Sequence, residues 1–167
     1  MSVKKISLLS LLAALAVAGR VSFQFIPNVQ PMTAVIMITS ILLGPLSGLI
    51  VAALGAFLSN LLMGMGYWTI SQVAAWGSIA VLFGYLGKLS VKRMLMIGTP
   101  FAVAAGYLYG FIVSLPMFIM TKHGWLYYLS GLPFDTAHAV GNGIFFFILY
   151  PVMARAYYSL SDRWLYS

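Results

Sequence analysis

The stretch Leu132-Pro133-Phe134-Asp135-Thr136-Ala137-His138-Ala139-Val140-Gly141-Asn142 opens the last long apolar segment of the chain. Only 7% of the residues are charged and 62% are hydrophobic, yet an acid, an imidazole and an amide fall here within eight residues. On a helix, Asp135, His138 and Asn142 lie within about 60° of one another. A charge inside a bilayer costs roughly 2.5–3.5 kcal/mol, so this face predicts a functional site. The alternative is that Asp135 and His138 pair near the membrane surface and anchor the helix end.

The composition identifies an integral membrane protein. Apolar runs of about 20 residues recur, scattered glycines accompany good helix formers, and no alternation typical of a β-barrel is present. The first run continues to about Val21, which favours a membrane span over a signal peptide. With no cysteine, disulfides and Cys-ligated metals are excluded. The net charge of +7 is spread over short loops, which is typical of membrane topology and does not indicate nucleic-acid binding.

The fold class predicted from these runs is all-α: a bundle of six transmembrane helices forming one domain, residues 1–167. The predicted spans are residues 4–25, 32–43, 46–63, 70–86, 94–120 and 134–157. Gly44-Pro45 is interpreted as a tight hairpin, because a single kinked span there would place the basic loop at residues 88–93 outside.

The distribution of basic residues predicts that both termini are cytoplasmic. One side carries seven of them, and the other carries Arg20 and Lys122, in agreement with the positive-inside rule. The seven are Lys4, Lys5, Lys88, Lys92, Arg93, Arg155 and Arg163.

No motif for catalysis is present, so we expect no enzyme, no catalytic residue and no metal site. The chain lacks a Gly-x-Ser-x-Gly elbow, an HExxH helix and a phosphate-binding P-loop. It is therefore not expected to hydrolyse nucleotide itself. An intramembrane hydrolase that uses His138 stays as an alternative.

Neutral polar and aromatic groups gather towards the predicted outer side and indicate a small-molecule site. Tyr67, Trp68 and Trp125 have the alternative of lying in an interfacial aromatic belt. Asn60 and Gln72 have the alternative of bonding to neighbouring helices. The predicted site residues are Asn28, Gln30, Asn60, Tyr67, Trp68, Gln72, Trp76, Trp125, Asp135, His138 and Asn142.

Small residues repeat at intervals of four on three spans and predict close helix–helix contacts. The first span carries Ser10, Ala14 and Ala18, either for a partner or for packing inside the bundle. The other two stripes are Gly48, Ala52 and Ala56, and Gly98, Ala102, Gly106, Gly110 and Ser114. For the last of these we expect internal packing.

Four segments together resemble the substrate-binding S-component of an energy-coupling factor (ECF) transporter. They are residues 25–31 (Phe-Ile-Pro-Asn-Val-Gln-Pro), 43–45 (Leu-Gly-Pro), 66–72 (Gly-Tyr-Trp-Thr-Ile-Ser-Gln) and 133–142 (Pro-Phe-Asp-Thr-Ala-His-Ala-Val-Gly-Asn). The resemblance covers nearly the whole chain and rests on the order of the motifs. Within the family, the chain is most similar to members that take up cobalamin.

The resemblance implies a subunit in the plasma membrane of a prokaryote that binds a vitamin on its outer face. It implies a transmembrane coupling protein and two cytoplasmic ATPases as partners, with ATP-driven toppling carrying the vitamin inward. Family members dock the coupling protein through an Ala-xxx-Ala motif, which Ala14 and Ala18 match and Ser10 extends. No cofactor of the chain's own is implied.

The polar groups of the predicted site suit a large, uncharged, amide-rich ligand. Cobalamin is the first candidate, with riboflavin or a modified nucleobase as alternatives, and His138 as an axial cobalt ligand is conceivable. Two other classes stay open: a membrane assembly protein that oligomerises through its stripes, and a stand-alone permease or channel.

Overall fold

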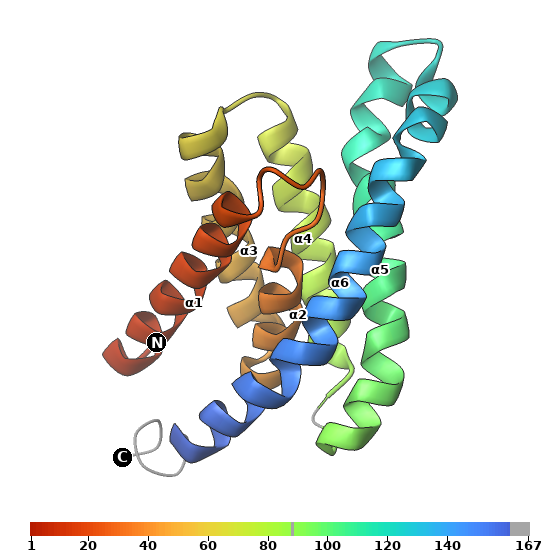
Figure 1. The fold of residues 1–167 in the computed structure, drawn as a ribbon. Coiled ribbons are helices and arrows are strands. Elements are labelled where there is room, and N and C mark those ends of the chain that lie inside the picture. Colours follow the sequence, from red (N-terminus) through yellow and green to blue (C-terminus); the bar gives the residue numbers. More distant parts are fainter. Residues whose placement is uncertain (88, 161–167) are drawn as a thin grey trace.

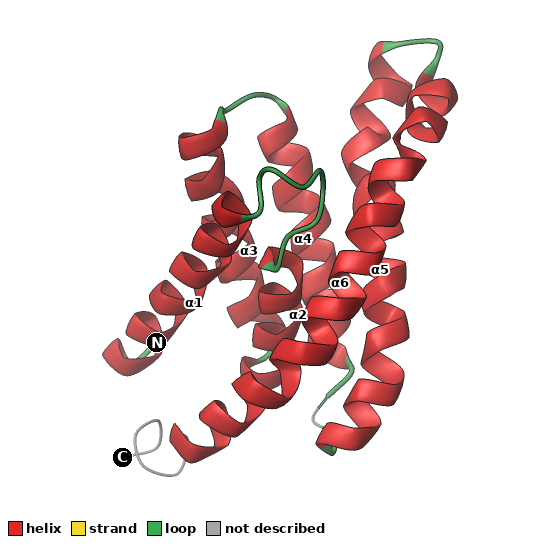
Figure 2. Ribbon diagram, viewed as in Figure 1, coloured by secondary structure: helices red, strands yellow, loops and turns green. Residues whose placement is uncertain are grey.

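Six helices make up the part of the chain that the structure, a computed structural model, describes: residues 1–87 and 89–160. They are α1 (Val3–Ser22), α2 (Met32–Leu43), α3 (Pro45–Met63), α4 (Trp68–Tyr85), α5 (Val91–Met120) and α6 (Gly124–Leu160). Figure 1 shows them side by side in one bundle, and Figure 2 shows helices joined by short connections throughout the described chain. We call the end with the connections 23–31, 64–67 and 121–123 the upper end.

Local sequence signals explain where several helices begin and end. The Ser2 hydroxyl caps α1 by accepting a hydrogen bond from the Lys5 backbone N–H at 3.3 Å. Gly44 separates α2 from α3 at a φ of 91°, a backbone conformation that side chains disfavour. Pro45 then begins α3, where its missing N–H costs nothing. The predicted Gly44-Pro45 hairpin is thus confirmed as a break between two helices.

Helix α2 forms the centre of the bundle. Every residue from Met32 to Leu42 is buried, because α1, α3, α4 and α6 all contact this helix. A helix that is apolar all round requires such enclosure. Its polar residues Thr33, Thr39 and Ser40 are therefore buried within the bundle core.

Helices α5 and α6 are the longest, at 30 and 37 residues, and pack along each other as a hairpin. The hairpin reaches beyond the α3–α4 connection at the upper end (Figure 1). A Cβ at Gly106 would overlap the backbone of Ala139, so only glycine allows this approach. The stripe at Gly98, Gly106 and Gly110 faces α6, which confirms the internal packing expected for it.

The predicted spans agree with the helices except at the start of α6. The structure begins this helix at Gly124 and carries it through Pro133, whereas the predicted span begins only at residue 134. That prediction was wrong because the missing N–H of Pro133 interrupts only one backbone bond, and the long contact with α5 supports the extra turns.

Four helices are long and apolar enough to cross a membrane, namely α1, α3, α5 and α6, and α2 is a shorter apolar helix. The count of six spans and the cytoplasmic position of both termini stay predictions. Lys88, Arg163 and the tail acid Asp162 lie outside the described residues.

Candidate functional site

An open cavity of about 500 Å³ lies at the upper end, where the 23–31 connection meets α4, α5 and α6. Three predicted site residues line it: Asn28, Gln72 and Asp135. Ser114, Ser130, Tyr109, Tyr127 and Phe134 add hydroxyls and aromatic rings to the wall. Amides, hydroxyls and one carboxylate around an aromatic-lined hollow are the usual means of orienting a small organic molecule.

Asn28 holds the first connection against the mouth of the cavity. Its backbone takes a φ of 60°, a left-handed conformation that asparagine tolerates better than most residues. Its side-chain Nδ2 donates to the carbonyl oxygen of Phe134 on α6 at 3.2 Å. The connection therefore spans from α1 to α6 and borders the site.

A buried hydrogen-bond network ties α1, α3 and α4 together beside the cavity. Arg20 at the end of α1 donates through Nη1 to Ser59 Oγ at 2.6 Å and to Asn60 Oδ1 at 3.0 Å. Asn60 Nδ2 in turn donates to Thr69 Oγ1 at 2.9 Å and to Gln72 Oε1 at 2.7 Å. Because Gln72 also lines the cavity, one chain of bonds connects the cavity wall to α1.

Stacked rings lie below the cavity and close its inner side. The Tyr109 ring lies 4.7 Å from His138 and 4.8 Å from Trp76, measured between centroids. The Arg20 guanidinium lies 5.0 Å from the centroid of the Trp76 ring, a cation–π contact. Tyr109 alone of these residues lines the cavity, so the stack forms a packed layer beneath the site.

Thr33 of α2 bonds to two members of this layer. Its hydroxyl oxygen accepts from Trp76 Nε1 at 2.9 Å and lies 2.9 Å from His138 Nε2. Since Trp76 can only donate, the Thr33 hydroxyl proton is free to be given to His138. A neutral His138 that accepts at Nε2 completes the bonds of Thr33 and Trp76, and leaves the buried Nδ1–H of His138 without a partner among the described residues.

The predicted site residues separate into four groups in the structure. Asn28, Gln72 and Asp135 line the cavity, and Asn60, Trp76 and His138 are buried beside or below it. Gln30 is buried and lines a smaller hollow under the 23–31 connection. Asp135 and His138 form no ion pair with each other in the described chain, so their pairing as an anchor is not what holds α6.

The other predicted site residues lie away from the cavity. Tyr67 and Trp68 are exposed and pack edge to face on each other at 5.5 Å. Trp125 is 62% exposed on the first turn of α6, with its ring 5.0 Å from Phe118. Asn142 is fully buried and does not line the cavity, and neither of its side-chain polar atoms has a hydrogen-bond partner within residues 1–87 and 89–160.

Sequence reasoning missed Arg20, Thr33 and Tyr109. A basic residue inside an otherwise apolar run was a usable signal for Arg20, which was assigned only to the charge count. Threonine and tyrosine are common in membrane helices, so nothing in the sequence singles out Thr33 and Tyr109. Their places beside the site follow only from the packing of α2 and α5.

The stripe at Ser10, Ala14 and Ala18 lies on the exposed face of α1. The buried face of that helix consists of Leu9, Ala13, Ala16 and Arg20. The small residues are thus not used for packing inside the bundle, and a flat strip of helix surface is left for contact with another molecule.

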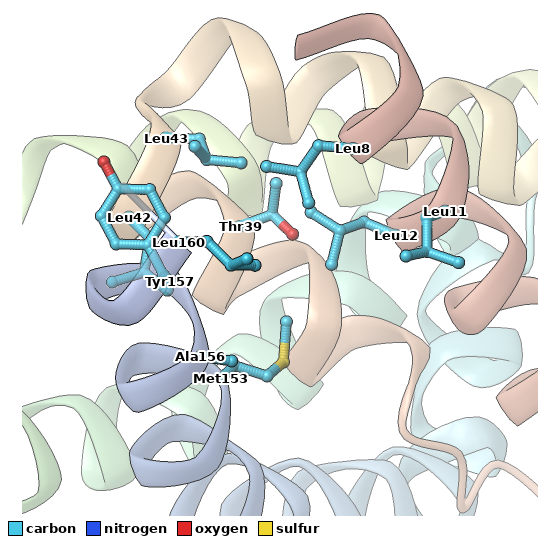
Figure 3. A pocket seen from close by; sticks show the side chains of 10 residues that line it. All are labelled: Leu8, Leu11, Leu12, Thr39, Leu42, Leu43, Met153, Ala156, Tyr157 and Leu160. Carbon is cyan, nitrogen blue, oxygen red and sulfur yellow. The ribbon is translucent and has the colours of Figure 1, made fainter. Parts of the chain in front are cut away.

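A second hollow, of about 190 Å³, lies at the lower end between α1, α2 and α6. Figure 3 shows leucines of α1 and residues of α6 around the Thr39 side chain, whose buried hydroxyl has no hydrogen-bond partner among the described residues. Aliphatic side chains dominate the lining, with that hydroxyl and the Tyr157 ring added. Such a lining offers few groups to orient a polar ligand, so the upper cavity is the better candidate site.

The apolar helices and the cavity are those of a multi-pass helical membrane protein with a candidate small-molecule site at one end of its bundle. The chain belongs to the family of the ECF-type riboflavin transporter, S component, whose sequence model matches residues 1–155. It is therefore an S-component, a subunit that works in vitamin uptake with ECF partner modules. No curated protein and no solved structure is matched by the chain.

Proposed function

We propose that the chain captures a vitamin in the upper cavity and releases it inward when partner ATPases drive the complex. The observation that carries this proposal is the cavity of about 500 Å³ lined by Asn28, Gln72 and Asp135, in a chain of the S-component family. The absence of a P-loop in the sequence supports an external source of energy and argues against an enzyme. No cofactor of its own enters this proposal.

Cobalamin is the first candidate ligand. The cavity is open at the upper end, so a molecule larger than the hollow can seat one part in it and leave the rest outside. The wall offers several neutral hydrogen-bonding groups and one carboxylate, which suits an amide-rich ligand. Buried at 1% exposure below the Tyr109 ring, His138 is not positioned as a cobalt ligand.

Riboflavin is the second candidate, and the name of the matched family favours it. A flat ring system can stack on Tyr109 or Phe134, which both line the cavity. Neutral amides and hydroxyls can bond to its carbonyl oxygens and its sugar-like chain.

Equilibrium binding to the purified chain, without ATP or partners, tests the function and separates the candidates. We expect one of the two vitamins to bind at one molecule per chain. Gln72→Leu removes a polar group of the wall and is expected to weaken binding by at least about tenfold, as the loss of a good hydrogen bond to ligand does. Serine at Ala74, exposed on the same helix outside the cavity, is the matched control. Binding of neither vitamin, nor of a wider vitamin panel, contradicts the proposal.

A further inference from the structure

The buried cation Arg20 is not paired with any carboxylate in the described chain. Its side chain is only 9% exposed, and its Nη1 group makes both of the hydrogen bonds that the structure gives it. A guanidinium carries five N–H donors, and the structure gives Nη2 and Nε no acceptor among the described residues. A buried charge without a counter-charge is costly, so some compensation is expected.

Arg20 is also one of the residues that line the smaller hollow already described for Gln30. This hollow, of about 110 Å³, lies under the 23–31 connection and is separate from the upper cavity. Gln24, Asn28 and Gln30 line it with Arg20, so three side-chain amides and one guanidinium meet there. No acid is among its lining residues.

Asn28 lines both this hollow and the upper cavity. The two hollows are therefore neighbours, and a ligand in the upper cavity that extends past Asn28 would enter the hollow lined by Arg20. The other contacts of Arg20, to Ser59, Asn60 and the Trp76 ring, hold the guanidinium in place before any ligand arrives. Such a fixed planar donor suits a group with two or three anionic oxygens.

We propose that the Arg20 hollow is a subsite for one anionic oxygen group of the ligand, a phosphate ester or a carboxylate. It rests on the proposed function in that the ligand is the vitamin held in the neighbouring cavity. The subsite favours ligands that are neutral and hydrogen-bonding over most of their surface and carry one such anionic group. Cobalamin carries one phosphodiester and riboflavin carries neither group, so the subsite favours the first of the two candidates. A single buried cation matches a single anion, whereas a polyanionic ligand would meet too few basic groups.

Inorganic sulfate tests the subsite without knowledge of the vitamin. The Trp76 ring reports on it because the guanidinium lies 5.0 Å from its centroid, so a variant with Trp76 as its only tryptophan is used (W68F/W125F/W164F). Sulfate is titrated against chloride at constant ionic strength, and Trp76 emission is recorded. We expect a saturable change, weakened at least about tenfold in Arg20→Gln, the loss typical of a charge-assisted pair.

Two further variants keep the test decisive if Arg20→Gln does not fold. Arg20→Lys keeps the charge but not the planar fork, and we expect weaker sulfate binding than with arginine. Gln24→Leu leaves Arg20 and its contacts intact and removes one amide of the hollow, and is also expected to weaken binding. The subsite is overturned if sulfate causes no saturable change in Trp76 emission. It is also overturned if sulfate binds to all three variants as tightly as it binds to the parent. Vitamin binding without sulfate binding contradicts the subsite alone, and sulfate binding without vitamin binding contradicts only the proposed function.

Discussion

Gly110 and Asp135 show how single residues shape the cavity. Both line it, and a Cβ at Gly110 would overlap the carboxylate of Asp135. We expect Gly110→Ala to displace that carboxylate, to cost about 1–3 kcal/mol of unfolding free energy, and to weaken vitamin binding. Thermal melting and equilibrium binding measure the two effects.

Gly131→Ala is the matched control for that prediction. Gly131 lines the same cavity, but a Cβ there meets nothing within 4 Å. Because alanine has a higher helix propensity than glycine, the melting temperature of the Gly131→Ala variant is expected to stay the same or to rise slightly. Equal destabilisation by the two substitutions would contradict the role of the Gly110–Asp135 contact.

Replacing either of the two buried asparagines, Asn142 and Asn60, by leucine is expected to change the stability of the protein in opposite directions. Asn142 is fully buried and its two polar atoms have no partner in the described part of the chain, so Asn142→Leu is expected to raise the unfolding free energy by about 1 kcal/mol or more. Asn60 bonds to Arg20, Thr69 and Gln72, so Asn60→Leu is expected to lower it by about 1–3 kcal/mol.

Melting curves of the two variants in one detergent compare these effects directly. Vitamin affinity is expected to be unchanged in Asn142→Leu, because that residue does not line the cavity. A loss of affinity there would show that the ligand reaches deeper than the cavity wall. A destabilised Asn142→Leu would show that the amide has partners in the membrane.

Residue types alone predicted part of the site. Asn28, Gln72 and Asp135 were predicted because polar groups are rare in apolar segments, and they line the cavity, while their contact with a ligand stays a prediction. Arg20 and Tyr109 were not found, because their roles depend on which residues of α3, α4 and α6 pack beside them. The sequence also did not predict that Trp68 and Trp125 are exposed, because aromatic rings occur both in binding sites and at membrane surfaces.

At the scale of elements, helix bounds were predictable where glycine and proline stand between apolar runs. The predicted bounds of α2 agree with Met32–Leu43, because Pro31 and Gly44 delimit it. The start of α6 was not predictable in the same way, because aromatic and polar residues around Trp125 resemble a loop until their contact with α5 is known. Long helices are stabilised by their neighbours more than by their own sequence.

The exposed strip on α1 leads to a prediction about partner docking. Replacing Ala14 or Ala18 by leucine leaves the buried residues Ala13 and Ala16 unchanged. It adds a larger side chain to the exposed strip, which would keep a partner helix from approaching closely. We expect vitamin uptake to fall at least about tenfold, the effect of about 1.4 kcal/mol lost on docking, while binding to the isolated chain stays unchanged.

Leucine at Ala74 is the matched control for the docking prediction. Ala74 is an exposed alanine on α4, away from the strip on α1. Uptake in cells that contain all partner subunits, and binding to the purified chain, are measured for each variant. Equal loss of binding in the α1 variants would mean that the strip serves the fold. An equal loss of uptake in the Ala74 variant would mean that added bulk anywhere on the surface is harmful.

At the scale of the whole molecule, the candidate vitamin cavity and most of the described basic residues lie at opposite ends, with Arg20 and Lys122 as the exceptions. The cavity opens at the upper end, whereas Lys4, Lys5, Lys92 and Arg93 lie near the starts of α1 and α5 at the lower end (Figure 1). Basic residues stay preferentially on the cytoplasmic side, so this polarity predicts an upper end that faces outward. Capture of an external vitamin requires the same orientation.

Cysteine labelling tests that orientation, because the chain has no cysteine of its own. Lys122→Cys places an exposed thiol in the connection at the upper end, and Ser90→Cys places one before α5 at the lower end. In intact cells, a maleimide that cannot cross the membrane is expected to label position 122 and to label position 90 only after permeabilisation. Both positions carry a thiol on an exposed residue, so each serves as the other's control for reactivity. The reverse pattern would place the cavity at the cytoplasmic face and exclude capture from outside. Labelling of both positions in intact cells would contradict a crossing of the membrane by α5, which lies between them.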